Sequence, residues 1–254
     1  MGGRFGIFVV LAFIVFGLTG CANTMKAIEN RELKVDAKMS ETIFLEAETL
    51  ASAKNGSSGS IFVRAANTSD FNEIDFGGLV KQKLEGMGYN VTPDPKKATI
   101  QVTANLLYLN EAKDGMNMQS VVSSGFGGAL LGASIAGVSG SSWRGVGQAG
   151  VAAGLAAGVV DGAAGMVFRV SEYIGVVDLQ VKEAVEGGVE GTQVATVTSG
   201  SSTTMNTVRA VKSDKQEHRT RIAVSARQTN IERVAATGAI SDRLAAQISG
   251  LFKM

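Results

Sequence analysis

The sequence predicts an α+β fold, in which a mixed or antiparallel sheet with flanking helices is interrupted by a glycine-zipper α-helical membrane hairpin. Three observations lead to this prediction. Apolar and polar residues alternate over 100–108, which is the period of a half-buried strand. Apolar residues recur at helical spacing over 79–87 and 240–252. Small residues recur at every fourth position in two arms within 124–168, a spacing typical of helices that pack closely inside a membrane.

Alternation of apolar and polar side chains identifies the strands. The apolar positions of the clearest strand are Ile100, Val102, Ala104, Leu106 and Tyr108. This pattern predicts that all five lie on one buried face of the sheet. Similar alternation predicts strands within 173–185 and 219–228, and an apolar run predicts another over 61–66.

Turn and helix signals lie between these strands. A helix over 79–87 is expected to end at Gly88, and a second helix covers 240–252. The glycines of 186–191 predict a turn, and the Ser/Thr-rich stretch 199–204 predicts a loop. We therefore expect a mixed or antiparallel sheet with helices on one side.

The small residues of the central stretch predict two membrane-inserted helices. The first arm, Ser124–Gly140, has about 17 residues and would be about 25 Å long as a helix, against a hydrocarbon core of about 30 Å. The second arm, Val146–Phe168, has about 23 residues and would be about 34 Å long. The residues assigned to helix packing are Gly128, Gly132, Ala136, Gly150, Gly154, Gly158 and Gly162. Small side chains at this spacing allow two backbones to touch in lipid.

Two polar features accompany the arms. Residues 141–144 form a turn between them, and we assign Trp143 and Arg144 of this turn to the membrane interface. Asp161 lies in the second arm, where it either faces the protein interior or marks the end of the span. The alternative interpretation of the whole stretch is a flexible Gly/Ala loop or a buried soluble hairpin. The regular four-residue spacing favours the membrane, because flexible linkers have no such register.

The amino terminus has the order of a secretory signal: Arg4, an apolar run, and small residues before Cys21. Leu18-Thr19-Gly20-Cys21 resembles the bacterial lipobox, in which the cysteine becomes the acylated amino terminus of the processed chain. The alternative is an ordinary signal with a chance cysteine. We expect no cofactor other than a covalent diacylglycerol and a fatty acyl group, such as palmitate, at Cys21. More than one acyl chain gives stable membrane anchoring.

Composition excludes several classes of function. The chain has 24 basic and 23 acidic residues, so no global charge indicates nucleic-acid binding. One cysteine and one histidine exclude a disulfide framework and a metal site of these ligands. Because no catalytic constellation is visible, we expect no enzyme. We expect His218 to be solvated, and we place Arg219, Arg221 and Arg227 together on the solvated face of a strand rather than in a ligand site.

Several of these features together resemble the TraT lipoproteins. They are the lipobox, the segment Met39–Glu46, the turn Asn67–Asp70, the ending Gly88-Tyr89 with the strand that follows, and the glycine-repeat hairpin. The resemblance implies an outer-membrane lipoprotein of conjugative plasmids, which acts without catalysis in surface exclusion and complement (serum) resistance. It also implies homo-oligomers, which we expect to form a ring, with outer-membrane lipids and the mating-apparatus or pilus components of a donor cell as partners.

The predicted layout follows from these assignments. It is a signal peptide over 1–20, an acylated tether over 21–40, an α+β domain made of 41–115 and 170–254, and the glycine-rich membrane hairpin over 116–169. The alternative function is an oligomeric outer-membrane lipoprotein channel, or an envelope-structural protein without a role in conjugation.

Overall fold

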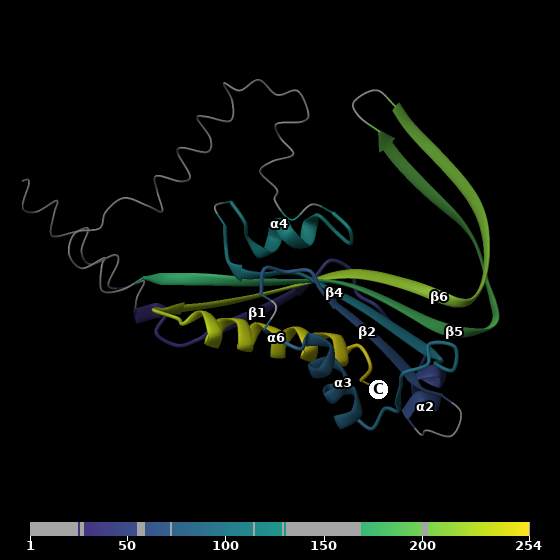
Figure 1. Cartoon of the computed structure of the whole chain (residues 1–254), viewed down its shortest axis with the longest axis horizontal. Coiled ribbons are helices and arrows are strands. Elements are labelled where there is room, and N and C mark those ends of the chain that lie inside the picture. The colour runs from purple at the N-terminus through teal and green to yellow at the C-terminus, as the bar shows by residue number, and fades with distance from the viewer. Residues whose placement is uncertain are drawn as a thin grey trace, which may run out of the picture.

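The computed structural model describes residues 25, 28–54, 59–71, 73–113, 115–128, 130, 169–199 and 203–253. Within this part of the chain, six strands form one sheet in the order β1-β6-β5-β4-β2-β3 (Figure 1). The strands are β1 (Lys34–Met39), β2 (Ile61–Asn67), β3 (Val91–Thr92), β4 (Ile100–Glu111), β5 (Val170–Ser199) and β6 (Thr203–Thr229). The helices are α2 (Ala47–Lys54), α3 (Phe76–Gly86), α4 (Met118–Ser123) and α6 (Arg233–Gly250).

The sheet is mixed. β2 is parallel to both β3 and β4, whereas β1, β6, β5 and β4 pair antiparallel. A parallel pair needs a crossover connection, and α3 supplies it between β2 and β3. β1 lies within the range predicted as a tether, where it pairs with residues 222–227 of β6.

The main core lies between one face of the sheet and the helices α2, α3 and α6 (Figure 1). Asp75 begins α3 as its N-cap, because its carboxylate accepts the Gly78 N–H at 2.9 Å. Phe76, Val80 and Leu84 turn inward from this helix. α6 approaches β5 so closely at Gly175 that a Cβ there would lie 2.3 Å from Ile240 Cγ2. The helix can pack at this distance only because Gly175 has no side chain.

A bulge in β4 corrects the predicted face of Tyr108. The register shifts between Leu106 and Tyr108, so the side-chain alternation is interrupted there. Leu106 and Leu109 belong to the main core, whereas Tyr108 packs on the opposite face of the sheet. The pattern of five alternating apolar residues therefore does not form one continuous face.

The opposite face of the sheet carries a smaller core beneath α4 (Figure 1). Its buried members are Tyr108, Met116, Val121, Val122, Ile174, Val176 and Ala223. Asn117 caps α4 by accepting the Ser120 N–H at 2.9 Å, while the Ser120 hydroxyl accepts the Asn117 N–H at 3.2 Å. The expectation of helices on one side only is therefore wrong, because both faces of the sheet are covered.

The predicted fold class, with its membrane hairpin over 116–169, is also wrong. No helix among the described residues is long and apolar enough to cross a membrane. The described start of this range forms α4, whose Val121 and Val122 are buried against the sheet instead of facing lipid. At Gly128 an added Cβ would lie 1.9 Å from the Ser124 carbonyl oxygen, which is a local reason for glycine.

The other residues assigned to the hairpin lie outside the described residues. They are Gly132, Ala136, Trp143, Arg144, Gly150, Gly154, Gly158, Asp161 and Gly162. Cys21 and the signal segment 1–20 also lie outside them.

β5 and β6 continue past the rest of the sheet as a two-stranded arm, defined here as 189–199 and 203–213 (Figure 1). β4 pairs with β5 only from Tyr173 to Glu183, so β5 and β6 pair only with each other in the described part of the arm. The predicted turn over 186–191 is wrong. The register shift between Ala184 and Val189 makes it a bulge inside a continuing strand.

Candidate functional site

A buried ion pair lies on the α4 side of the sheet. Arg221 of β6 faces Asp178 of the neighbouring strand β5 in the antiparallel register. Its Nε donates to Asp178 Oδ1 at 2.6 Å and its Nη2 donates to Asp178 Oδ2 at 2.9 Å. The arginine is 0% exposed and the aspartate 8% exposed. This bidentate geometry satisfies both charges away from water.

The loop after α4 closes over this ion pair. Arg221 Nη1 donates to Ser124 Oγ at 2.6 Å, and the Gly127 N–H donates to Asp178 Oδ2 at 2.8 Å. Gly125 and Gly127 have φ values of 65° and 72°, in the region that favours glycine. We call Ser124, Gly127, Asp178 and Arg221 the clamp. It fastens the start of the glycine-rich stretch to the sheet.

The clamp corrects one assignment and is a buried arrangement that sequence reasoning missed. Arg221 was expected on the solvated face, but α4 and its loop cover that part of the sheet. Arg219 and Arg227 are about half exposed and pair with Glu217 and Glu172, as side chains on a wet face do. An Asp in one alternating strand and an Arg in the next were the available signal, but their register was not predictable.

A polar groove of about 920 Å³ lies at the base of the arm. It is lined by Gln180, Lys182, Val189, Gly191, Thr192, Ser213, Lys215, Gln216, Glu217 and Arg219. Glu217 binds Arg219 and lies 3.3 Å from Lys182 Nζ, while Lys215 Nζ donates to the Ala98 carbonyl at 2.8 Å. The groove therefore has three cations and one carboxylate.

The surrounding cations and hydrogen-bond donors lower the pKa of Glu217. Burial acts to raise it, but hydrogen bonds from Gln180, Arg219 and Lys182 and the positive charge of Arg219 outweigh burial. The pKa of Glu217 consequently lies below its ordinary value of 4.5. Arg219 also stacks on the Phe126 ring at 5.3 Å, which connects the groove with the clamp loop.

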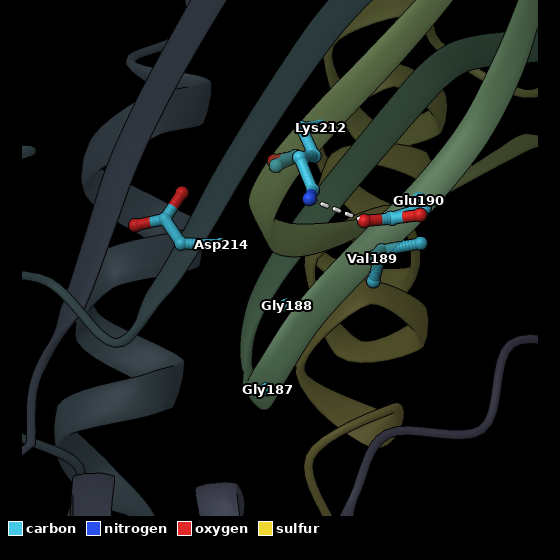
Figure 2. A pocket seen from close by; sticks show the side chains of 7 residues that line it. Gly187, Gly188, Val189, Glu190, Lys212 and Asp214 are labelled. Atoms are coloured by element: carbon cyan, nitrogen blue, oxygen red, sulfur yellow. Dashed lines mark ion pairs between the residues drawn. The ribbon is translucent and has the colours of Figure 1, made fainter.

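Two consecutive glycines lie where the arm leaves the sheet. Gly187 and Gly188 have φ values of 84° and 71°, and they form the bulge where the arm leaves the sheet (Figure 2). A Cβ at Gly188 would lie 3.0 Å from the Ser213 carbonyl oxygen. Just beyond the bulge, Lys212 Nζ lies 2.5 Å from Glu190 Oε1 across the two strands (Figure 2). We call Gly187-Gly188 the double-glycine bulge.

The prediction that His218 is solvated is wrong. Its Nε2 lies 2.8 Å from Glu183 Oε1, and the histidine and glutamate side chains are 18% and 1% exposed. The other carboxylate oxygen, Oε2, accepts the Glu46 N–H at 2.9 Å. The pair closes the end of the main core, where the loop before α2 crosses β5. In the described part of the chain, no group of three or more His, Cys, Asp or Glu residues is placed to hold a metal ion.

Comparison with known protein families shows which family the chain belongs to. The family of the enterobacterial TraT complement resistance protein matches residues 32–252, from just before β1 to just past the end of α6. The chain belongs to the TraT family. The match includes the clamp, the arm and both cores.

Individual TraT proteins match over almost their whole length. A TraT complement resistance protein of Escherichia coli is 30% identical over 238 residues, which is 93% of each chain. That of Escherichia coli strain K12 is 29% identical over 244 residues, or 96% of each chain. Among solved structures, a PelC dodecamer from Paraburkholderia phytofirmans covers 86% of this chain and 98% of its own, at 6% identity and a TM-score of 0.30. That score is too low to carry an argument about fold or assembly.

Proposed function

We propose that this TraT-family protein is a lipid-anchored outer-membrane protein that acts without catalysis in surface exclusion and complement resistance. The observation that carries the proposal is the family match over 32–252. The lipobox cysteine Cys21 supports the anchor, because it lies eleven positions before the matched region and four before Met25. Acylation at this cysteine would hold the sheet domain at the membrane surface.

We further propose that the protein acts as a homo-oligomeric ring whose subunits meet through the arm. Each residue from Val189 to Ser199 pairs with one from Thr203 to Ser213, which makes a ribbon about 36 Å long at about 3.3 Å per residue. A two-stranded ribbon is marginally stable alone in water. A neighbouring copy would supply the missing contacts, and a head-to-tail contact of this kind closes into a ring when its rotation permits.

Such a ring supports a simple mechanism of exclusion. Many copies at the cell surface would contact or mask components of the mating apparatus or pilus of a donor cell. No chemical step is required of the protein, because steric occupation or binding is sufficient. The same layer at the surface would limit the access of complement to the outer membrane.

The assembly is tested by shortening the arm without changing its register. Deleting 193–198 together with 204–209 removes residues that pair with one another, so Thr192 stays opposite Ala210 and Ser199 opposite Thr203. Native mass spectrometry of the lipidated protein in detergent should show a single oligomer for wild type and a lower stoichiometry for the shortened chain. The matched control is Lys212→Ala, which removes an exposed ion pair and leaves the ribbon intact. A wild-type monomer, or an unchanged oligomer after shortening, would refute assembly through the arm.

The cellular role is tested in recipient cells that express the protein. Plasmid entry from a donor carrying a related plasmid should fall by at least tenfold, and survival in serum should rise. A Cys21→Ser variant should lose both effects and should leave the outer-membrane fraction. If wild-type cells neither exclude the plasmid nor resist serum, the proposed function is wrong.

A further inference from the structure

Exposed apolar side chains gather at one end of the sheet, where β1 and β5 begin and β6 ends. These side chains are Met25, Ile28, Leu33, Val170 and Val234. They are between 37% and 70% exposed, and the described chain has only two other large apolar side chains this exposed, Phe44 and Phe126. We call these five residues the basal patch. Water contacts apolar surface unfavourably, so such a gathering indicates a contact surface.

Hydrogen bonds hold the three segments of this end together. The Thr229 N–H donates to the Asn30 carbonyl at 2.8 Å, which joins the chain before β1 to the end of β6. The Arg169 N–H donates to Asn230 Oδ1 at 2.9 Å, and the Asn230 N–H donates to the Arg169 carbonyl at 2.7 Å. Val234 follows in the first turn of α6. These bonds fix the chain before β1, the start of β5 and the end of β6 together at one end of the sheet.

The position of Cys21 in the sequence indicates that a lipid bilayer covers the basal patch. Cys21 precedes Met25 by four residues, so the two cannot be separated by more than about 14 Å even if the chain is fully extended. Acyl chains carried by Cys21 would consequently enter a lipid bilayer within reach of the basal patch. The arm lies at the other end of β5 and β6 (Figure 1). Acyl chains on Cys21 would therefore lie at the same end of the sheet as the basal patch.

We infer that the basal patch rests on the lipid bilayer, with its five apolar side chains in the interfacial layer beside the acyl chains and with the arm starting at the opposite end of the sheet. This inference depends on the proposed acylation of Cys21. Two ion pairs lie beside the patch: Arg169, next to Val170, binds Glu111 at 2.7 Å, and Arg227, opposite Lys34, binds Glu172 at 2.6 Å. Apolar contact and covalent anchor would then act together and fix the orientation of the sheet.

Phe44 provides a matched control, because it is 83% exposed and lies far from the patch. Glu46, two residues later, donates its N–H to Glu183, which is thirteen residues along β5 from Val170. At about 3.3 Å per residue this places Phe44 about 40 Å from the basal patch along the sheet. A contact that depended only on exposed apolar area would treat Phe44 and Val234 alike.

The test uses the full lipidated chain in vesicles of phosphatidylethanolamine and phosphatidylglycerol. Cys21 is the only cysteine and would be acylated, so Leu33→Cys, Val234→Cys and Phe44→Cys each create one labelling site for an environment-sensitive fluorophore. Fluorophores at 33 and 234 should shift to the blue and be quenched at least threefold by lipids that carry a spin label near the headgroup. The fluorophore at 44 should show neither effect. Equal quenching at 44 and 234, or none at 33 and 234, would overturn the inference.

Two further measurements separate the causes of a negative result. Intact mass spectrometry of the same samples reports the acyl groups: an unacylated chain contradicts the proposed function, whereas an acylated chain without quenching contradicts only the basal contact. Disulfide cross-linking of Val234→Cys in detergent tests a second copy of the chain as the occupant. Efficient cross-linking together with absent lipid quenching would assign the basal patch to an interface between subunits and overturn the inference.

Discussion

Removing the Asp178 carboxylate should destabilise the fold by about 4 kcal/mol. Asp178→Leu leaves the guanidinium of Arg221 fully buried, with the Ser124 hydroxyl as its one remaining partner among the described residues, and it removes the acceptor of the Gly127 N–H. Breaking a buried ion pair from one side costs about 3–5 kcal/mol, whereas Gly127 is exposed and its N–H can bond to water instead. A loss of about 4 kcal/mol is a large fraction of the about 5–15 kcal/mol that stabilises a typical domain.

The assay is urea denaturation of the full chain in detergent, followed by circular dichroism of the sheet. The matched control is Glu172→Ala, which breaks the half-exposed pair with Arg227 and should cost less than about 1 kcal/mol. A double variant, Arg221→Met with Asp178→Leu, removes both charges and should recover most of the lost stability. Proteolysis near Ser124 should increase in the single and the double variants, because each releases the loop that the clamp holds.

Two results would refute this reasoning. If Asp178→Leu costs no more than Glu172→Ala, the ion pair is not buried as described. If the double variant is as unstable as the single variant, the cost comes from packing or from the loop and not from an uncompensated charge.

Three further predictions concern glycines and charge. Gly175→Ala should destabilise the protein by about 1–3 kcal/mol in the same denaturation assay, because α6 must move to make room for a Cβ. Gly238→Ala, an open position inside α6, should instead stabilise it by up to about 1 kcal/mol, and equal effects at the two positions would contradict the packing. Gly188→Ala should destabilise the protein by about 1–2 kcal/mol because of its left-handed φ alone. It should also speed hydrogen exchange of the arm's backbone amides, and unchanged exchange would show that the bulge does not direct the arm. Because the folded pKa of Glu217 is depressed, its contribution to stability is present above its ordinary value of 4.5 and is lost as pH falls through the lower folded value, so the gap between wild type and Glu217→Gln should close on acidification.

Elements whose signals are local could be predicted from sequence. α3 begins at Asp75 and buries Val80 and Leu84 as its spacing indicates, and β2 covers the run that begins at Ile61. Both depend on neighbours within a few residues. Hydrophobic periodicity and side-chain capping are sufficient for such elements.

The errors arose where the answer depends on distant parts of the chain. The double-glycine bulge has the composition of a turn, but the register between β5 and β6 continues through it. The burial of Arg221 depends on α4, which lies about 100 residues earlier and whose packing against the sheet has no local signal. The four-residue repeat of small side chains was interpreted as a membrane hairpin, whereas its described beginning, up to Gly128, closes over the sheet. The clamp, the groove and the basal patch can be predicted only when the register between the strands is known.

β5 and β6 pair with each other from the basal patch to the far end of the arm, with one break in register at the double-glycine bulge. β5 alone has 30 residues, a contour of about 100 Å at about 3.3 Å per residue. The part of β5 within the sheet, from Val170 to Ala184, spans about 46 Å at about 3.3 Å per residue, so a rotation of about 5° at the base moves the start of the arm by about 4 Å. Attachment at the base then sets how far the arm can reach sideways.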